Sequence, residues 1–153
     1  MSDEYVVERK KSIDASPSEV FTHVVDLREW DNWSPWAAMD PEMDKTYGGE
    51  QGAVGSTYGW SGNRKVGQGQ MTVTEVETPS RVAINLEFLK PFKSQSVTEM
   101  LVSASGDGSE VTWRMTGQHT MMTKVMGIFR SMDKMVGPDF EKGLTTLKQV
   151  VET

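Results

Sequence analysis

The feature that most limits what this chain can fold into is its middle half, residues 44–120, where short alternating runs are separated by glycine-rich breaks. In the clearest run the apolar residues take every second position. These residues are Val82, Ile84, Leu86 and Phe88. A period of two is typical of a β-strand that buries one face. The many glycines before residue 70 predict that the first strands of this segment are short and bent.

A hairpin is predicted at the end of this segment. The runs 94–104 and 110–116 are joined by Gly106-Asp107-Gly108, a combination that favours a tight turn between antiparallel strands. In the second of these runs, Val111, Trp113 and Met115 should share one face.

Helical signals flank the strands on both sides. A first strand over residues 5–13 is followed by Ser16-Pro17-Ser18-Glu19, which has the spacing of a capping box. Asp26 and Glu29 repeat that spacing, which predicts a second short helix that carries Trp30 and Trp33 and that Pro35 ends.

The last thirty or so residues are predicted to be helical. Apolar residues recur there at three-to-four spacing. The pair Gly137-Pro138 interrupts this pattern, so proline either kinks one long helix or begins a second one.

The order of these elements predicts an α+β fold in one domain, residues 1–153. One antiparallel sheet has a face to bury, and the long C-terminal helix is the large partner that the chain offers. If the sheet curls around that helix, as its glycines permit, a gap can remain between them. Such a gap would be lined by inward strand residues and by the apolar face of the helix.

Composition excludes several classes of function. Asp and Glu number 22 against 16 Lys and Arg, and the net charge of −6 does not suit a protein that neutralises nucleic-acid phosphates. The chain has no cysteine and two histidines, so we expect no metal site and no cofactor. The start is acidic and no long apolar run follows, so we expect a cytoplasmic protein without integral membrane association.

Several stretches resemble one known family. They are Ile13-x-Ala15-x-Pro17-x-x-Val20-Phe21, Trp30-Asp31-Asn32-Trp33-Ser34-Pro35-Trp36, Gly55-x-x-Tyr58-x-Trp60-x-Gly62-Asn63, Gly108-Ser109-x-Val111-Thr112-Trp113 and Gly137-x-x-Phe140-x-x-Gly143-Leu144. On these residues the chain resembles the START/Bet v 1-like (SRPBCC) superfamily and, within it, the polyketide cyclase/dehydrase-like branch. The resemblance implies a helix-grip fold, in which a curved antiparallel sheet wraps around a long C-terminal helix, two short helices follow the first strand, and a cavity is enclosed.

The resemblance also implies a hydrophobic or aromatic small-molecule ligand, lipid- or polyketide-like, in that cavity. Aromatic, methionine and other apolar side chains suit such a site, although each could instead fill the core. The residues expected to contact the ligand are Trp30, Trp33, Trp36, Tyr58, Trp60, Leu86, Phe88, Trp113, Met115, His119, Met126, Phe129 and Phe140.

Chemistry beyond binding has three weak candidates. His119, Tyr58 and Asn63 could move protons if the chain is an enzyme, although a surface or capping role also suits His119. His23 is expected in solvent, because it falls away from the apolar face of its helix.

Charged residues of the strands pose a separate question. Glu87 and Glu99 are expected to point outward into solvent. Arg9 and Lys11 share strand parity with Val7 and so depart from the pattern. Either a bulge or a strand end places these cations in solvent, or one of them points into the cavity and holds an anionic ligand head.

Three functions therefore stay open. The first is a carrier or sensor of an apolar molecule, the second is a polyketide cyclase or dehydratase acting on such a molecule, and the third is a protein-interaction module. The oligomeric state, monomer or homodimer, is equally open.

Overall fold

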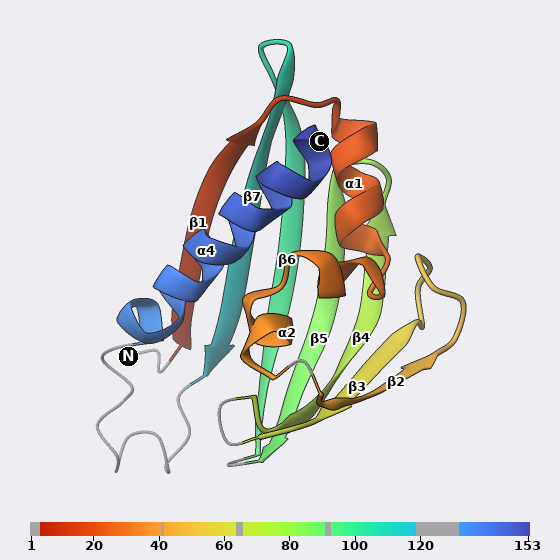
Figure 1. Ribbon diagram of the computed structural model, residues 1–153, viewed down its shortest axis with the longest axis vertical. Coiled ribbons are helices and arrows are strands. Elements are labelled where there is room, and N and C mark those ends of the chain that lie inside the picture. Colours follow the sequence, from red (N-terminus) through yellow and green to blue (C-terminus); the bar gives the residue numbers. More distant parts are fainter. Residues whose placement is uncertain (1–3, 41, 64–65, 91–92, 119–131) are drawn as a thin grey trace.

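The computed structural model describes residues 4–40, 42–63, 66–90, 93–118 and 132–153. In this part of the chain, helices on one side face a sheet whose seven strands are antiparallel and lie in the order β1-β7-β6-β5-β4-β3-β2 (Figure 1). The elements are β1 (Glu4–Ile13), α1 (Pro17–Val25), η1 (Glu29–Asn32), α2 (Pro35–Met39), β2 (Asp44–Gly48), β3 (Thr57–Ser61), β4 (Gln68–Glu77), β5 (Arg81–Lys90), β6 (Ser94–Ser105), β7 (Gly108–Gln118) and α4 (Met132–Glu152).

This arrangement confirms the predicted α+β helix-grip fold, in which α4 runs across the curved sheet. The hairpin between β6 and β7 turns at Gly106, whose φ of +57° is a conformation that favours glycine. α1 begins where the capping box predicts, since the side chain of Ser16 accepts a hydrogen bond from the backbone N–H of Glu19.

The prediction for the second short helix is wrong in one respect. The segment Glu29–Asn32 forms a 3₁₀ turn, and Pro35 begins a further helix, α2, instead of only ending the turn. Proline fits the first position of a helix because its fixed φ is helical and its missing N–H would have no partner there.

The alternatives at Gly137-Pro138 are also decided. α4 continues through Pro138 as one helix from Met132 to Glu152. Its residues Phe140, Leu144, Leu147 and Val151 are buried against the sheet and the first helices.

The core between β7 and α4 is built around Trp113. Phe140 stacks on this ring with centroids 4.1 Å apart and planes 5° apart. Trp30, Trp33 and Trp36 meet it edge-on from the η1–α2 segment, with centroids 5.5, 5.3 and 5.9 Å away. Edge-to-face and offset-stacked rings add attraction beyond the apolar area that they bury. Trp113 therefore joins the sheet, the short helices and α4.

Gly143 lets α4 approach this cluster closely. A Cβ atom at this position would lie 2.8 Å from Cζ3 of Trp113 and 2.9 Å from Cδ of Pro35. Both of these atoms belong to rigid rings in the core, so neither can give way cheaply.

We expect Gly143→Ala to lower the free energy of unfolding by about 1–2 kcal/mol, because overpacking at two rings outweighs the gain in helix propensity. Chemical denaturation would measure the change. Gln149→Ala, at an exposed position of the same helix, is the control and should change stability by less than about 0.5 kcal/mol. A stabilised Gly143→Ala protein would contradict this account of the packing.

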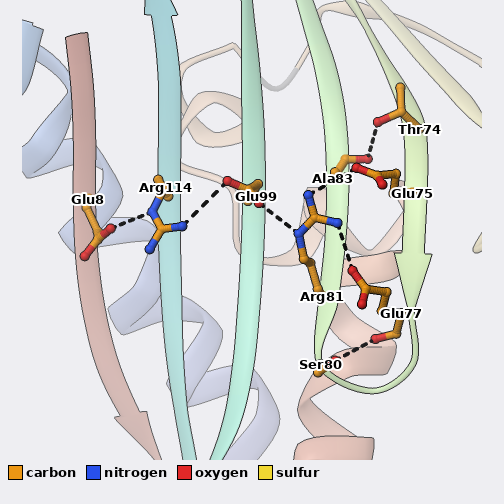
Figure 2. Close-up of polar contacts among 9 residues, drawn as sticks. All are labelled: Glu8, Thr74, Glu75, Glu77, Ser80, Arg81, Ala83, Glu99 and Arg114. Carbon is orange, nitrogen blue, oxygen red and sulfur yellow. Dashed lines mark hydrogen bonds and ion pairs between the residues drawn. The ribbon is translucent and has the colours of Figure 1, made fainter.

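The outer face of the sheet carries a chain of ion pairs across several strands, and Figure 2 shows it. Nε of Arg114 lies 2.6 Å from Glu8, and its Nη1 lies 3.7 Å from Glu99. The same Glu99 lies 2.9 Å from Nε of Arg81, which also pairs with Glu77 at 2.9 Å. Glu99 does point outward, but the prediction that it stands in solvent is wrong. Its side chain is 18% exposed because two guanidinium groups cover it.

Replacing Glu99 with glutamine should lower the free energy of unfolding by about 1–2 kcal/mol, because both arginines lose their shared carboxylate. The loss should shrink as salt is added, since salt screens the remaining charges. Glu77→Gln removes an exposed partner of Arg81 and should cost less than about 0.5 kcal/mol. Urea titrations at low and high salt would compare the two variants, and equal losses would contradict a central role for Glu99.

Candidate functional site

Nine of the thirteen predicted ligand-contacting residues fall into two groups in the structure. In the first group, Trp30, Trp33, Trp113 and Phe140 are at most 5% exposed and are each other's neighbours. Trp36 is half-buried beside them. At this end of the molecule, the protein's own rings occupy the space between β7 and α4.

The second group lies on the inner face of β3, β4 and β5, beyond the tryptophan cluster. Together with Met71, which was not predicted, this group forms what we call the aromatic inner surface, and its residues are Tyr58, Trp60, Met71, Leu86 and Phe88. The rings of Trp60 and Phe88 meet edge-on at 5.4 Å, and the ring of Tyr58 lies 6.0 Å from that of Trp60. Trp60, Leu86 and Phe88 are only half-buried. The described residues therefore leave apolar area uncovered on this inner face.

Two contacts orient Trp60 on this surface. Its Nε1 donates a hydrogen bond to the carbonyl of Val66 at 2.8 Å. Its ring also lies over Gly69, where a Cβ atom would come within 2.6 Å of Cη2. The indole of Trp60 can therefore lie against β4 because Gly69 has no side chain. Any larger residue at this position would displace the ring.

Strand register continues this surface into one row across the whole sheet, which we call the inner row. Each member is the cross-strand partner of the next, from β2 to β1. The members are Tyr47, Tyr58, Met71, Leu86, Ser96, Gly117 and Tyr5. The row is apolar at Met71 and Leu86, has a hydroxyl at Ser96, and contains all three tyrosines of the protein, two at one end and one at the other.

The phenol groups of the inner row differ in their partners. Tyr47 donates a 2.7 Å hydrogen bond to Oδ2 of Asp31, which Lys45 also approaches at 3.2 Å. Tyr5 hydrogen-bonds Ser96. Tyr58 is 7% exposed, and no other described residue bonds its hydroxyl. This hydroxyl is the polar group of the aromatic inner surface that is left to bond a ligand.

Burial raises the pKa of each tyrosine above its ordinary value of 10. For Tyr47 the hydrogen bond to Asp31 adds to the effect, and for Tyr58 the negative charge of Asp31 adds to it. For Tyr5 the bond with Ser96 opposes it. A phenol that holds its proton this firmly donates a hydrogen bond and is a poor base.

Arg9 also faces inward. The pairing of β1 with β7 is regular from Glu4 to Ile13, which excludes a bulge and places Arg9 opposite Trp113. Its guanidinium occupies the place of the missing side chain at Gly137 of α4, and its Nε lies 3.4 Å from Glu141. Lys11 is half-buried opposite Val111. The inward-facing guanidinium of Arg9 is thus held by α4.

The other polar candidates have different surroundings. Asn63 is exposed in the β3–β4 connection, where its Oδ1 accepts from the backbone of Val66 and its Nδ2 donates to the carbonyl of Met39. His23 is not in solvent as expected. Its side chain is 22% exposed, with Nδ1 3.6 Å from Glu29, and the indole N–H of Trp33 donates a hydrogen bond to the His23 carbonyl.

Three predicted site residues, His119, Met126 and Phe129, lie outside the described residues. Met115, by contrast, is buried in the core on the inner face of β7. Among the described residues no group of three or more His, Asp and Glu side chains comes together that could hold a metal ion.

The sequence analysis did not identify Met71 of the aromatic inner surface or Tyr47 of the inner row. Met71 alternates with Val73 along β4 and so carries the period-two signal that identified Leu86 on β5. Tyr47 lies on a strand of five residues, too short for periodicity to place.

Comparison with known proteins agrees with this architecture. A sheet that grips a C-terminal helix defines the START/Bet v 1-like class. Within it, the chain belongs to the family described as polyketide cyclase/dehydrase and lipid transport, whose model matches residues 5–152. No curated protein matches the chain in sequence.

None of the helices in the described part of the chain combines the length and the apolar character needed to cross a membrane.

Solved structures with low sequence identity share the fold. Protein CV1439 from Chromobacterium violaceum is 12% identical with a TM-score of 0.70, and the alignment covers 97% of both chains. Ara h 8.0201 is 10% identical with a TM-score of 0.66 and the same coverage. The Aha1 dimer from Colwellia psychrerythraea is 15% identical with a TM-score of 0.62, covering 97% of this chain and 96% of the other. At these identities the similarity shows the fold alone.

The three raised tyrosine pKas predict how stability depends on pH. The folded protein keeps these protons at a pH where the unfolded chain releases them, so the free energy of unfolding should fall as pH rises above about 10. Ultraviolet difference absorbance should show little tyrosinate in the folded protein at that pH. Tyr58→Phe should make the decline less steep. A native protein whose tyrosines ionise at their ordinary pKa would contradict the described burial.

Proposed function

We propose that this protein binds an elongated, largely apolar small molecule against the aromatic inner surface. The observation that carries the proposal is the aromatic inner surface, where the half-buried side chains of Trp60, Leu86 and Phe88 lie on the same face of the sheet as the hydroxyl of Tyr58. Pockets for small molecules combine a predominantly apolar lining with a few polar groups that fix orientation. Membership of a family named for cyclases, dehydrases and lipid transport supports the same class of ligand.

Tyr58 is the residue that would orient the ligand. Its hydroxyl keeps its proton, has no hydrogen-bond partner among the described residues, and stands beside the rings of Tyr47 and Trp60. A carbonyl or hydroxyl oxygen of the ligand would accept its hydrogen bond. The ligand is therefore an apolar body with at least one oxygen acceptor, as polyketide-like and lipid-like molecules are.

Binding is favoured over catalysis by the chemistry of the same surface. The ionisable groups in the inner row are the three tyrosines, and raised pKa values suit them to donate hydrogen bonds instead of abstracting protons. Asp31 is the carboxylate that reaches these tyrosines, and it already accepts the hydrogen bond of Tyr47 and pairs with Lys45. No described carboxylate or imidazole bonds the hydroxyl of Tyr58, so the described residues assemble no acid–base pair for a cyclase or dehydratase at that hydroxyl.

A matched pair of variants on β5 tests the proposal. Leu86 lies on the aromatic inner surface, whereas Leu89 is 43% exposed on the same strand. Thermal-shift titration with oleic acid and with 1-naphthol should raise the melting temperature of the unmodified protein, because a ligand that binds only the folded state stabilises it. Leu86→Gln should reduce this shift and Leu89→Gln should leave it unchanged.

Tyr58→Phe should weaken 1-naphthol binding about two- to tenfold, the effect of one lost hydrogen bond. Native mass spectrometry of the purified protein would show whether a molecule is carried along from the cell. No stabilisation of the unmodified protein by either compound, or equal losses in the two leucine variants, would contradict the proposal.

A further inference from the structure

A second concave feature lies outside the sheet–helix interior. An open surface pocket of about 390 Å³ lies between the η1–α2 segment, β2 and α4. Figure 1 shows α2 lying between α4 on one side and β2 on the other. None of the residues of the aromatic inner surface lines this pocket, so it does not depend on the function proposed above. Its volume is within the range of pockets that bind small molecules.

The wall of this pocket is rigid. Trp33 lines it, and the same indole packs edge-on against Trp113 in the core and donates a 2.9 Å hydrogen bond from Nε1 to the carbonyl of His23. Pro35 and Ala37, in the first turns of α2, continue this wall as small apolar groups. An apolar body placed here would meet a preformed surface, which lowers the entropy cost of binding.

The charges around the pocket do not balance. Lys45 lies 3.2 Å from Asp31, and the same carboxylate accepts the hydrogen bond from Tyr47. Lys142 of α4 lines the pocket from the other side, is exposed, and has no acidic partner among the described residues. One positive charge is thus left over, in a chain whose net charge is −6.

Thr146 completes the polar side of the pocket. It lies one turn after Lys142 on α4, and its hydroxyl donates a 3.1 Å hydrogen bond to the Lys142 carbonyl. Its oxygen is left to accept a hydrogen bond from a ligand. The pocket therefore combines an apolar wall on α2 with a cation and a hydroxyl on α4.

We propose that this pocket binds a small carboxylate with a flat apolar body, such as an aromatic acid. The carboxylate pairs with Lys142, and the ring lies against Ala37, beside the largely buried Pro35. A single unmatched cation suits a monoanion, whereas a dianionic phosphate ester would leave a charge without a partner. Because Lys142 is exposed, the ion pair contributes modestly to affinity and is weakened by salt.

Two probes and two variants test this site. The probes are naphthalene-2-carboxylate and its neutral amide, naphthalene-2-carboxamide, which share the ring system and differ in charge. The variants are Lys142→Gln and, as the matched control on the same helix, Lys134→Gln, which changes an exposed lysine that does not line the pocket. Amide chemical shifts from heteronuclear NMR locate the bound probe, and their titration gives its affinity.

The carboxylate should shift amide signals of residues 31–37 and 142–146. Lys142→Gln should weaken its binding about two- to fivefold and leave the amide probe unaffected. Lys142→Glu should weaken it further, and Lys134→Gln should have no effect. The proposal is overturned if the two glutamine variants behave alike, if no shifts appear at millimolar probe, or if the shifts centre on Tyr58 and Leu86. The last outcome would assign the probe to the aromatic inner surface instead.

Discussion

The stacking of Trp113 on Phe140 is the contact on which the rest of this structure depends. It joins β7 to α4, and the edges of three further tryptophans bring the η1–α2 segment to the same point. Gly143 makes the contact possible because its missing side chain lets the helix lie directly on the ring. Helix, sheet and short helices are thus positioned by one aromatic centre.

The inner face of the sheet has two parts, the packed aromatic cluster around Trp113 and the aromatic inner surface beyond it, and they have different roles. Around Trp113 the rings fill the interior themselves, which stabilises the fold. Beyond it, Trp60, Leu86 and Phe88 are only half covered, and Tyr58 presents a hydroxyl there. Because α4 is fixed at the aromatic centre, the sheet can be held firmly at one end while the described residues leave apolar area uncovered at the other. That difference is what supports the proposed ligand site.

Much of the fold could be predicted from local signals. Alternation placed Leu86 and Phe88 on one face of β5, the capping box marked the start of α1, and the glycine turn marked the hairpin. Pro35 shows the limit of such signals, because proline both ends one helical segment and begins another, and the sequence pattern does not say which effect prevails. Arg9 shows a second limit. Strand parity indicated an inward cation, but the space that accepts it is made by Gly137, more than a hundred residues away.

The sequence by itself determined the order of strands and helices, the faces that they bury and the family resemblance, because these depend on spacing along the chain. Only the tertiary structure decided which aromatic residues became packed core and which remained partly open, since that depends on how closely α4 approaches the sheet. It alone also brought Asp31, Lys45, Lys142 and Thr146 around one surface pocket. These residues come from three separate segments, and no local pattern records the distance between them.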